Sequence, residues 1–296
     1  MVLIYKSEGT MPKFKMLLSM FIFGTLGVFI TNLNMPSAVI AALRAVIATV
    51  FILLYLLVSG QKIDFSAIKK NAPVLVISGA AIGFNWILLF EAYRYTTVAV
   101  ATLCYYMAPV FVIVVSPFIL KERLTISKLF CAAAAVLGAV LISGASKNSG
   151  YLGILFGLLA AMLYASVVIM NKFIKNLKNT ERTLCQMGSA AMVMLIYVII
   201  TNGFSGLVFD AKAAGLILTV GIIHTGIAYI LFFAGVASLP AQTSAVLSYI
   251  DPVTAVILSG AMLGQPITYI QIIGAVLILG STLINEALSY RGKINQ

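Results

Sequence analysis

Long apolar runs separated by short polar gaps dominate the chain. Each run has about 20 residues, the length that a helix needs to cross the hydrocarbon core of a bilayer. The runs do not alternate apolar with polar positions, as the short strands of a membrane barrel do, and a helix satisfies its own backbone hydrogen bonds in lipid. The pattern predicts an all-α integral membrane protein with ten transmembrane helices, at residues 14–33, 37–59, 72–93, 98–119, 126–145, 151–171, 183–201, 212–234, 241–263 and 268–289.

The composition supports a lipid environment and excludes several other classes. Apolar residues make up 62% of the 296 residues and charged residues 9%, against about 45–50% and about 25% in soluble domains. The net charge of +11 does not indicate nucleic-acid binding, because the cations lie in short gaps and not on one basic face. Cys104, Cys131 and Cys185 lie inside apolar runs, and no Cys/His spacing suits a metal. We expect the bilayer as a partner, and neither nucleic acid, metal nor cofactor.

The basic residues are distributed unequally between the two sides of the predicted membrane. If the N-terminus is cytoplasmic, only Arg94, Lys147 and Lys212 face outward, and Arg44 lies within the second apolar run. The other fifteen of the 19 cations share the inner side: Lys6, Lys13, Lys15, Lys62, Lys69, Lys70, Lys121, Arg123, Lys128, Lys172, Lys175, Lys178, Arg182, Arg291 and Lys293. Positive charge concentrates on the cytoplasmic side of membrane proteins. We therefore expect a multi-pass protein of the cell membrane, the bacterial cytoplasmic membrane, with both termini cytoplasmic.

The two halves of the chain repeat one another. An offset of 143 places the segment from Tyr106 to Val110, with Pro109, on the segment from Tyr249 to Val253, with Pro252. Each half has five predicted helices, an odd number, so the second half enters the membrane with the opposite polarity. The sequence predicts two inverted five-helix repeats, residues 1–147 and 148–296, within one membrane domain, and this architecture is typical of secondary transporters.

Several segments resemble a known family. They are Ala41 to Arg44 in the second run, the stretch from Pro109 to Thr125, and the stretch from Asp251 to Gly264. Together they are similar to the EamA-type members of the drug/metabolite transporter superfamily, which have two five-helix repeats. The resemblance implies a membrane transporter, from a family that exports amino acids, other metabolites and toxic amphiphiles. The chain departs from the family pattern at Gln265, where a Glu is usual, and at Tyr164, where a Trp is frequent.

Two ionisable residues fall near the middle of their predicted helices, Asp251 and His224. A charged side chain there costs about 2.5–3.5 kcal/mol on insertion scales, so each is a candidate for function. Asp251 either binds substrate or protons, or caps a helix that Pro252 breaks. His224 either joins Asp251 in a central polar site or is a core histidine bonded to a backbone carbonyl.

Arg44 and Glu91 are predicted nearer the outer face. Either they form an ion pair that pins the second and third helices, or Glu91 is the cation-attracting or proton-carrying group of an outward vestibule. Arg94 follows Glu91 by three residues and could pair with it instead.

Aromatic and amide side chains complete the candidate substrate site: Asn85, Trp86, Tyr105, Tyr106, Tyr229 and Tyr249. At mid-membrane depth their polar groups need partners, and their rings can hold a cation or another ring. For any single tyrosine, packing is the alternative role. Tyr106 and Tyr249 occupy equivalent positions in the two repeats, which favours a shared central location.

These observations predict a secondary transporter of a small metabolite, an amino acid, an amine or an organic cation, that works as an exporter. We expect an amine-bearing or cationic cargo held by Trp86, Tyr106 and Tyr249, with Glu91 drawing it in. Coupling to proton entry stays open; a carboxylate moved into lipid favours its neutral form, so Asp251 could exchange a proton. An enzyme is disfavoured, because neither a second midplane carboxylate nor a Gly-x-Ser-x-Gly turn is present. The alternative is a lipid-handling or structural membrane protein without solute transport, and monomer and homodimer both stay open.

Overall fold

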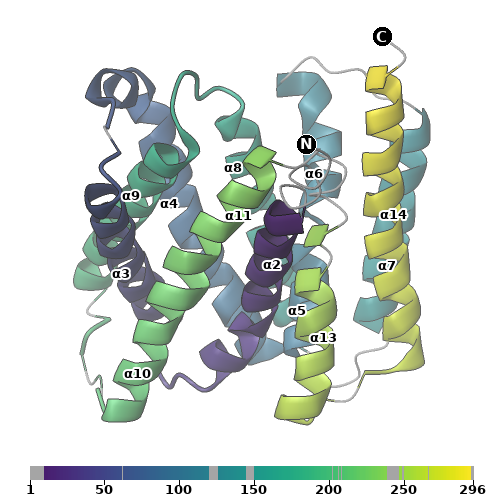
Figure 1. The fold of residues 1–296 in the computed structure, drawn as a ribbon. Coiled ribbons are helices and arrows are strands. Elements are labelled where there is room, and N and C mark those ends of the chain that lie inside the picture. Colours follow the sequence, from purple (N-terminus) through teal and green to yellow (C-terminus); the bar gives the residue numbers. More distant parts are fainter. Residues whose placement is uncertain are drawn as a thin grey trace.

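The structure is a computed structural model, and it describes residues 10–61, 63–119, 126–144, 150–201, 203–205, 207, 209–238, 247–248, 250–265 and 267–294. Throughout these residues the regular secondary structure is helical (Figure 1). The helices are α2 (Thr10–Thr31), α3 (Ser37–Val58), α4 (Phe65–Tyr95), α5 (Val98–Tyr105), α6 (Ala108–Ile119), α7 (Ile126–Gly144), α8 (Tyr151–Asn171), α9 (Asn179–Ile200), α10 (Ala211–Thr219), the π-helix η1 (Val220–Ile227), α11 (Ala228–Ser238), α13 (Ile250–Leu263) and α14 (Tyr269–Ile294).

Seven helical segments in the described part of the chain are long and apolar enough to cross a membrane. They coincide with the first to fourth and the sixth to eighth predicted spans. The fifth, ninth and tenth predicted spans coincide with the shorter apolar helices Leu129–Gly138, Ile250–Leu263 and Tyr269–Ser281. The all-helical membrane class is therefore confirmed, while the count of ten spans and their inverted repetition stay predictions.

Polar side chains cap several helices where they leave the apolar region. The Asp64 carboxylate accepts a hydrogen bond from the Ala67 amide at 2.9 Å, and the Asp210 carboxylate accepts one from the Ala213 amide at 2.6 Å. Thr97 caps α5 in the same way. Each cap satisfies an amide that the first helical turn leaves without an intrahelical partner, so these residues begin α4, α5 and α10.

Two of the predicted continuous spans are interrupted. The span at 98–119 divides into α5 and α6 at Tyr106 and Met107. Pro109 lies in the first turn of α6, where an amide hydrogen has no intrahelical acceptor, so the proline costs no hydrogen bond. A break inside the membrane is tolerated where the freed backbone lines a cavity. This break places Tyr106 at the end of α5.

The span at 212–234 contains the π-helix η1. Two of its side chains reach back five residues to backbone carbonyls: the Thr225 hydroxyl donates to the Val220 carbonyl at 2.8 Å, and His224 Nδ1 lies 3.4 Å from the carbonyl oxygen of Thr219, the last residue of α10. π-helical turns are rare and occur frequently at functional sites. Hydropathy alone indicates neither interruption.

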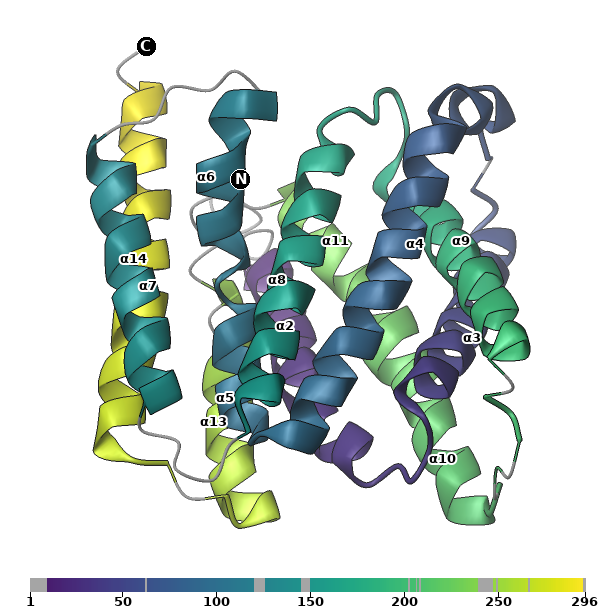
Figure 2. The ribbon, with the colours of Figure 1, turned by 180° about the vertical axis from the view of Figure 1, so that it is seen from behind.

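The helices form a bundle with one packed group at each of two opposite edges and further helices between them. α7 and α14 pack against each other at one edge, and α3, α4 and α9 pack together at the opposite edge (Figures 1 and 2). α2, α5, α8, α11 and α13 lie between these groups. The close packing of α4 on α9 requires glycine: a Cβ atom on Gly79 would lie 2.5 Å from the Gln186 carbonyl oxygen, and one on Gly83 would lie 2.7 Å from Met194 Cγ.

The helix ends gather at two opposite faces. One face holds the junctions α3/α4 and α8/α9, the end of α6 and the end of α14; the other holds α2/α3, α4/α5, α9/α10 and α13/α14 (Figure 1). Lys69 and Lys178 belong to the first face and Lys212 to the second, as the charge distribution predicts. Lys6, Lys62, Lys121, Arg123 and Lys147 lie outside the described residues.

The charge asymmetry predicts which face is cytoplasmic. With the three native cysteines replaced by alanine, a cysteine at position 212 is expected to react with a membrane-impermeant maleimide in intact cells, because Lys212 is exposed on the predicted outer face. A cysteine at position 178, equally exposed on the other face, is expected to react only after the cells are permeabilised. The opposite labelling pattern would show that the orientation is inverted.

Candidate substrate-binding site

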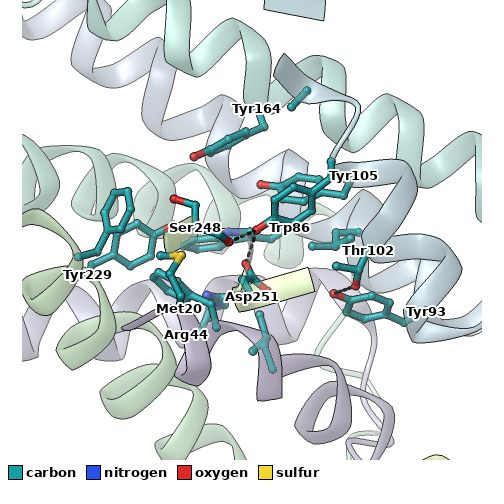
Figure 3. A pocket seen from close by; sticks show the side chains of 16 residues that line it. Met20, Arg44, Trp86, Tyr93, Thr102, Tyr105, Tyr164, Tyr229, Ser248 and Asp251 are labelled. Carbon is teal, nitrogen blue, oxygen red and sulfur yellow. Dashed lines mark hydrogen bonds between the residues drawn. The ribbon is translucent and has the colours of Figure 1, made fainter. Parts of the chain in front are cut away.

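A cavity of about 300 Å³ lies between helices from both halves of the chain (Figure 3). Its wall includes polar groups from α3, α5 and α13 and aromatic rings from α2, α4, α8 and α11. The lining residues are Met20, Phe23, Leu26, Arg44, Trp86, Leu89, Tyr93, Thr102, Tyr105, Tyr106, Ala108, Tyr164, Tyr229, Phe232, Ser248 and Asp251. The volume suits a small metabolite, since ligand pockets begin at about this size.

Aromatic rings form most of the cavity wall. Tyr105 lies with its ring centroid 6.3 Å from Tyr106 and 5.4 Å from Tyr164. Across the cavity, the Phe23 ring meets Tyr229 edge to face at 5.2 Å. Such a wall offers ring faces to an apolar or cationic group and restricts water.

Asp251 is the acidic member of the cavity wall among the described residues. It lies in the first turn of α13, and its Oδ2 accepts a hydrogen bond from the Tyr106 hydroxyl at 3.0 Å. The same hydroxyl lies 3.3 Å from the Ser248 carbonyl oxygen. The α5/α6 break and the start of α13 therefore meet at this carboxylate.

Arg44 is 2% exposed on α3 and lines the same cavity. Its Nε donates a hydrogen bond to the Thr225 hydroxyl at 3.0 Å, and its guanidinium carbon lies 4.0 Å from the centroid of the Trp86 ring. Its terminal nitrogen Nη1 is buried and has no hydrogen-bond partner in the described part of the chain. The cation is thus oriented by neutral groups.

The predicted Arg44–Glu91 ion pair is not formed. Glu91 Oε1 lies 3.7 Å from Arg94 Nη1, one turn along α4, and Arg94 also donates to the Met35 carbonyl. Neighbours at i and i+3 share one helix face, so Arg94 satisfies Glu91 at the end of α4. Glu91 does not appear among the residues that line the cavity.

Two further candidates, Asn85 and His224, do not line the cavity. Asn85 is buried against α8, where its side-chain amide donates to the Ala160 carbonyl at 2.5 Å and its oxygen lies 3.5 Å from the Tyr105 hydroxyl. The Nε2 atom of His224 lies 2.8 Å from the Thr25 hydroxyl, and the contact of its Nδ1 with the Thr219 carbonyl at the end of α10 fits the structural alternative. Tyr249 lies outside the described residues.

Several residues of the wall were not predicted from the sequence, chiefly Tyr93, Thr102 and Tyr164. Trp86, Leu89 and Tyr93 follow the i, i+3, i+7 spacing of a single helix face, and that spacing could have selected Tyr93 once Trp86 was chosen. Tyr164 stands where the family frequently has Trp, and this departure could have indicated that the position belongs to the site.

The fold and the cavity define a polytopic membrane protein with a solute-sized cavity between its two halves. The sequence model of the EamA-like transporter family matches residues 12–144 and 151–286, so the chain belongs to this family, within the drug/metabolite transporter superfamily. It is a membrane transporter.

Relatives and a solved structure support this assignment. The chain is 30% identical over 288 residues to the uncharacterized transporter YxxF of Bacillus subtilis, with 95% of this chain and 91% of YxxF covered. It is 26% identical to an uncharacterized transporter of Archaeoglobus fulgidus, covering 90% and 93% of the two chains. A crystal structure at 21% identity aligns with 95% of this chain and 98% of its own chain at a TM-score of 0.64, which supports the fold.

Proposed function

We propose that this transporter is a secondary carrier that exports a small amine-bearing metabolite, an amino acid, an amine or an organic cation, through the central cavity. The observation that carries the proposal is the Asp251 carboxylate in an aromatic wall. An ammonium group is complementary to both, because a carboxylate attracts it and ring faces hold cations. Bacterial relatives support a location in the cytoplasmic membrane.

We further propose that export is coupled to proton entry at Asp251. The carboxylate accepts one hydrogen bond, from Tyr106, and has no cation within ion-pair distance among the described residues. A carboxylate without a fixed counterion can bind either a proton or a cationic cargo. Competition of the two for one group is the simplest way to couple their movements.

An alternating-access mechanism of two inverted repeats, residues 1–147 and 148–296, accounts for the movement. The packing of the helices supports it, because exchanging the halves preserves the neighbours: α4 packs on α8 as α11 packs on α2, while α3/α9 and α7/α14 pair with each other. The two segments matched by the family model, residues 12–144 and 151–286, fall on either side of the proposed boundary. Rocking of one repeat against the other would open the cavity to each side in turn.

Transport in proteoliposomes tests the proposal. A thermal-shift screen of amino acids, polyamines and organic cations is expected to give at least one ligand, and vesicles loaded with that ligand are expected to accumulate its labelled form by counterflow. An imposed pH gradient is expected to drive net movement. Binding without counterflow would favour the lipid-handling or structural alternative, and counterflow unaffected by the gradient would remove proton coupling while keeping the carrier.

A further inference from the structure

The charge of Arg44 has no counterion in the described part of the chain. The structure describes the side chains of five acidic residues, and four have other roles: Asp64 and Asp210 cap helices, Glu91 pairs with Arg94, and Glu181 accepts hydrogen bonds from the Asp64 and Lys178 amides at the α8/α9 end. The fifth, Asp251, lines the cavity with Arg44 but forms no ion pair with it. A buried guanidinium with no counterion is expensive in free energy, so a role beyond packing is required.

The neighbours of Arg44 orient its guanidinium without neutralising it. The hydrogen bond from Nε to Thr225 fixes one edge of the planar group, and its central carbon lies over the Trp86 ring, 4.0 Å from the centroid. The other edge of the group carries the two terminal nitrogens. Of these, Nη1 is buried and has no hydrogen-bond partner among the described residues. Two parallel N–H groups on one edge match the two oxygens of a carboxylate.

We propose that Arg44 is a carboxylate-binding subsite of the central cavity, so that the cargo is a zwitterion whose carboxylate binds Arg44 while its ammonium group faces Asp251. This inference rests on the proposed function and narrows its substrate class, because simple amines and organic cations leave Arg44 unpaired.

The charges of the wall favour a carboxylate over a more highly charged anion. One arginine and one aspartate face the cavity among the described residues, so their charges balance a zwitterion. A phosphate dianion would meet one cation and the repulsion of Asp251. The aromatic wall around Phe23 and Tyr229 accommodates the apolar remainder of the cargo.

The test compares matched ligands that differ by one charged group. The first set is L-phenylalanine, 2-phenylethylamine and 3-phenylpropanoate; the second is L-leucine, 3-methylbutylamine and 4-methylpentanoate. Binding of each to the purified full-length protein is measured for the wild type, Arg44→Gln and the control Arg182→Gln, an arginine that does not line the cavity. The wild type and the control are expected to bind the amino acid of at least one set tenfold or more tightly than its amine, since a hydrogen-bonded charge pair contributes a factor of that order.

In Arg44→Gln this preference is expected to vanish, with the amine bound as tightly as before or more tightly because a positive charge has been removed. Equal binding of amine and amino acid by the wild type, or a preference that persists in Arg44→Gln, would overturn the inference while the proposed carrier function stands. Binding of none of the six ligands while a polyamine or organic cation of the broader screen binds would overturn the inference alone, and no ligand in either set would contradict both.

A stability measurement separates this role from a structural one. Removal of an uncompensated buried charge does not weaken the fold, so the melting temperature of ligand-free Arg44→Gln is expected to equal or exceed that of the wild type. A marked decrease would indicate that Arg44 mainly holds α3 to η1, and would count against the subsite. Arg44→Lys keeps the charge without the planar edge and is expected to retain only part of the preference, whether or not the glutamine variant folds.

Discussion

The substitution Asp251→Asn is expected to lower transport driven by a pH gradient at least tenfold while exchange of cargo across the membrane continues. Asparagine has nearly the size of aspartate, and its oxygen can still accept the hydrogen bond from the Tyr106 hydroxyl that now spans 3.0 Å. It cannot bind and release a proton, so the step that couples proton entry to export is lost. Counterflow and gradient-driven uptake in the same proteoliposomes measure the two activities separately.

Asp210→Asn is the matched control for this experiment. Asp210 caps α10 and does not line the cavity, and asparagine caps helices as well as aspartate does, so both activities are expected to stay at the wild-type level. Full gradient-driven activity in Asp251→Asn would exclude Asp251 from coupling. A loss of counterflow as well, with an unchanged melting temperature, would assign Asp251 to cargo binding alone.

The substitution Tyr106→Ala is expected to weaken cargo binding by up to about thirtyfold. A cation at an aromatic face gains roughly 0.5–2 kcal/mol, and alanine removes both the ring and the hydroxyl that contacts Asp251. Tyr106→Phe keeps the ring face and is expected to cost less, because the ammonium group of the cargo can replace the lost hydroxyl at the carboxylate. Titration of the purified variants with the best ligand of the screen gives the dissociation constants.

Tyr197→Ala provides the control for Tyr106. The Tyr197 ring packs edge to face on Phe84 at 5.6 Å, outside the cavity wall, so its loss is expected to leave the dissociation constant unchanged. Unchanged binding in Tyr106→Ala would contradict the aromatic site. Transport of anions such as phosphorylated sugars would contradict the proposed cargo.

The sequence predicted the membrane helices well because their signal is long and continuous. A window of about 20 apolar residues averages over local irregularities, and for the same reason it could not show the break at Tyr106 and Met107 or the π-helix η1. The positions of Asp251 and Trp86 in the cavity follow from depth and residue type. Tyr249 remains a prediction, since it lies outside the described residues.

The wrong predictions at the site concern the helix face on which a side chain lies, and not its depth in the membrane. Asn85 precedes Trp86 in sequence, but consecutive residues point about 100° apart around a helix, so one faces α8 and the other faces the cavity. Arg44 and Glu91 were both predicted nearer the outer face, yet Glu91 pairs with Arg94 on its own helix. Depth along a helix can be counted from sequence, whereas the direction of a side chain depends on which helices become neighbours.

The π-helix η1 also sets the register of everything that follows it. Each residue turns an α-helix by about 100°, and a π-helical turn takes up one residue more than an α-helical turn, so winding the same residues Val220–Ile227 as regular α-helix would rotate α11 by about that angle. Tyr229 and Phe232, which line the cavity, would then face away from it. The aromatic wall on this side thus depends on the π-helical winding of the Val220–Ile227 segment as much as on its residue types, and substitutions that restore α-helical winding there without a change of length would alter the cavity while leaving the apolar span intact.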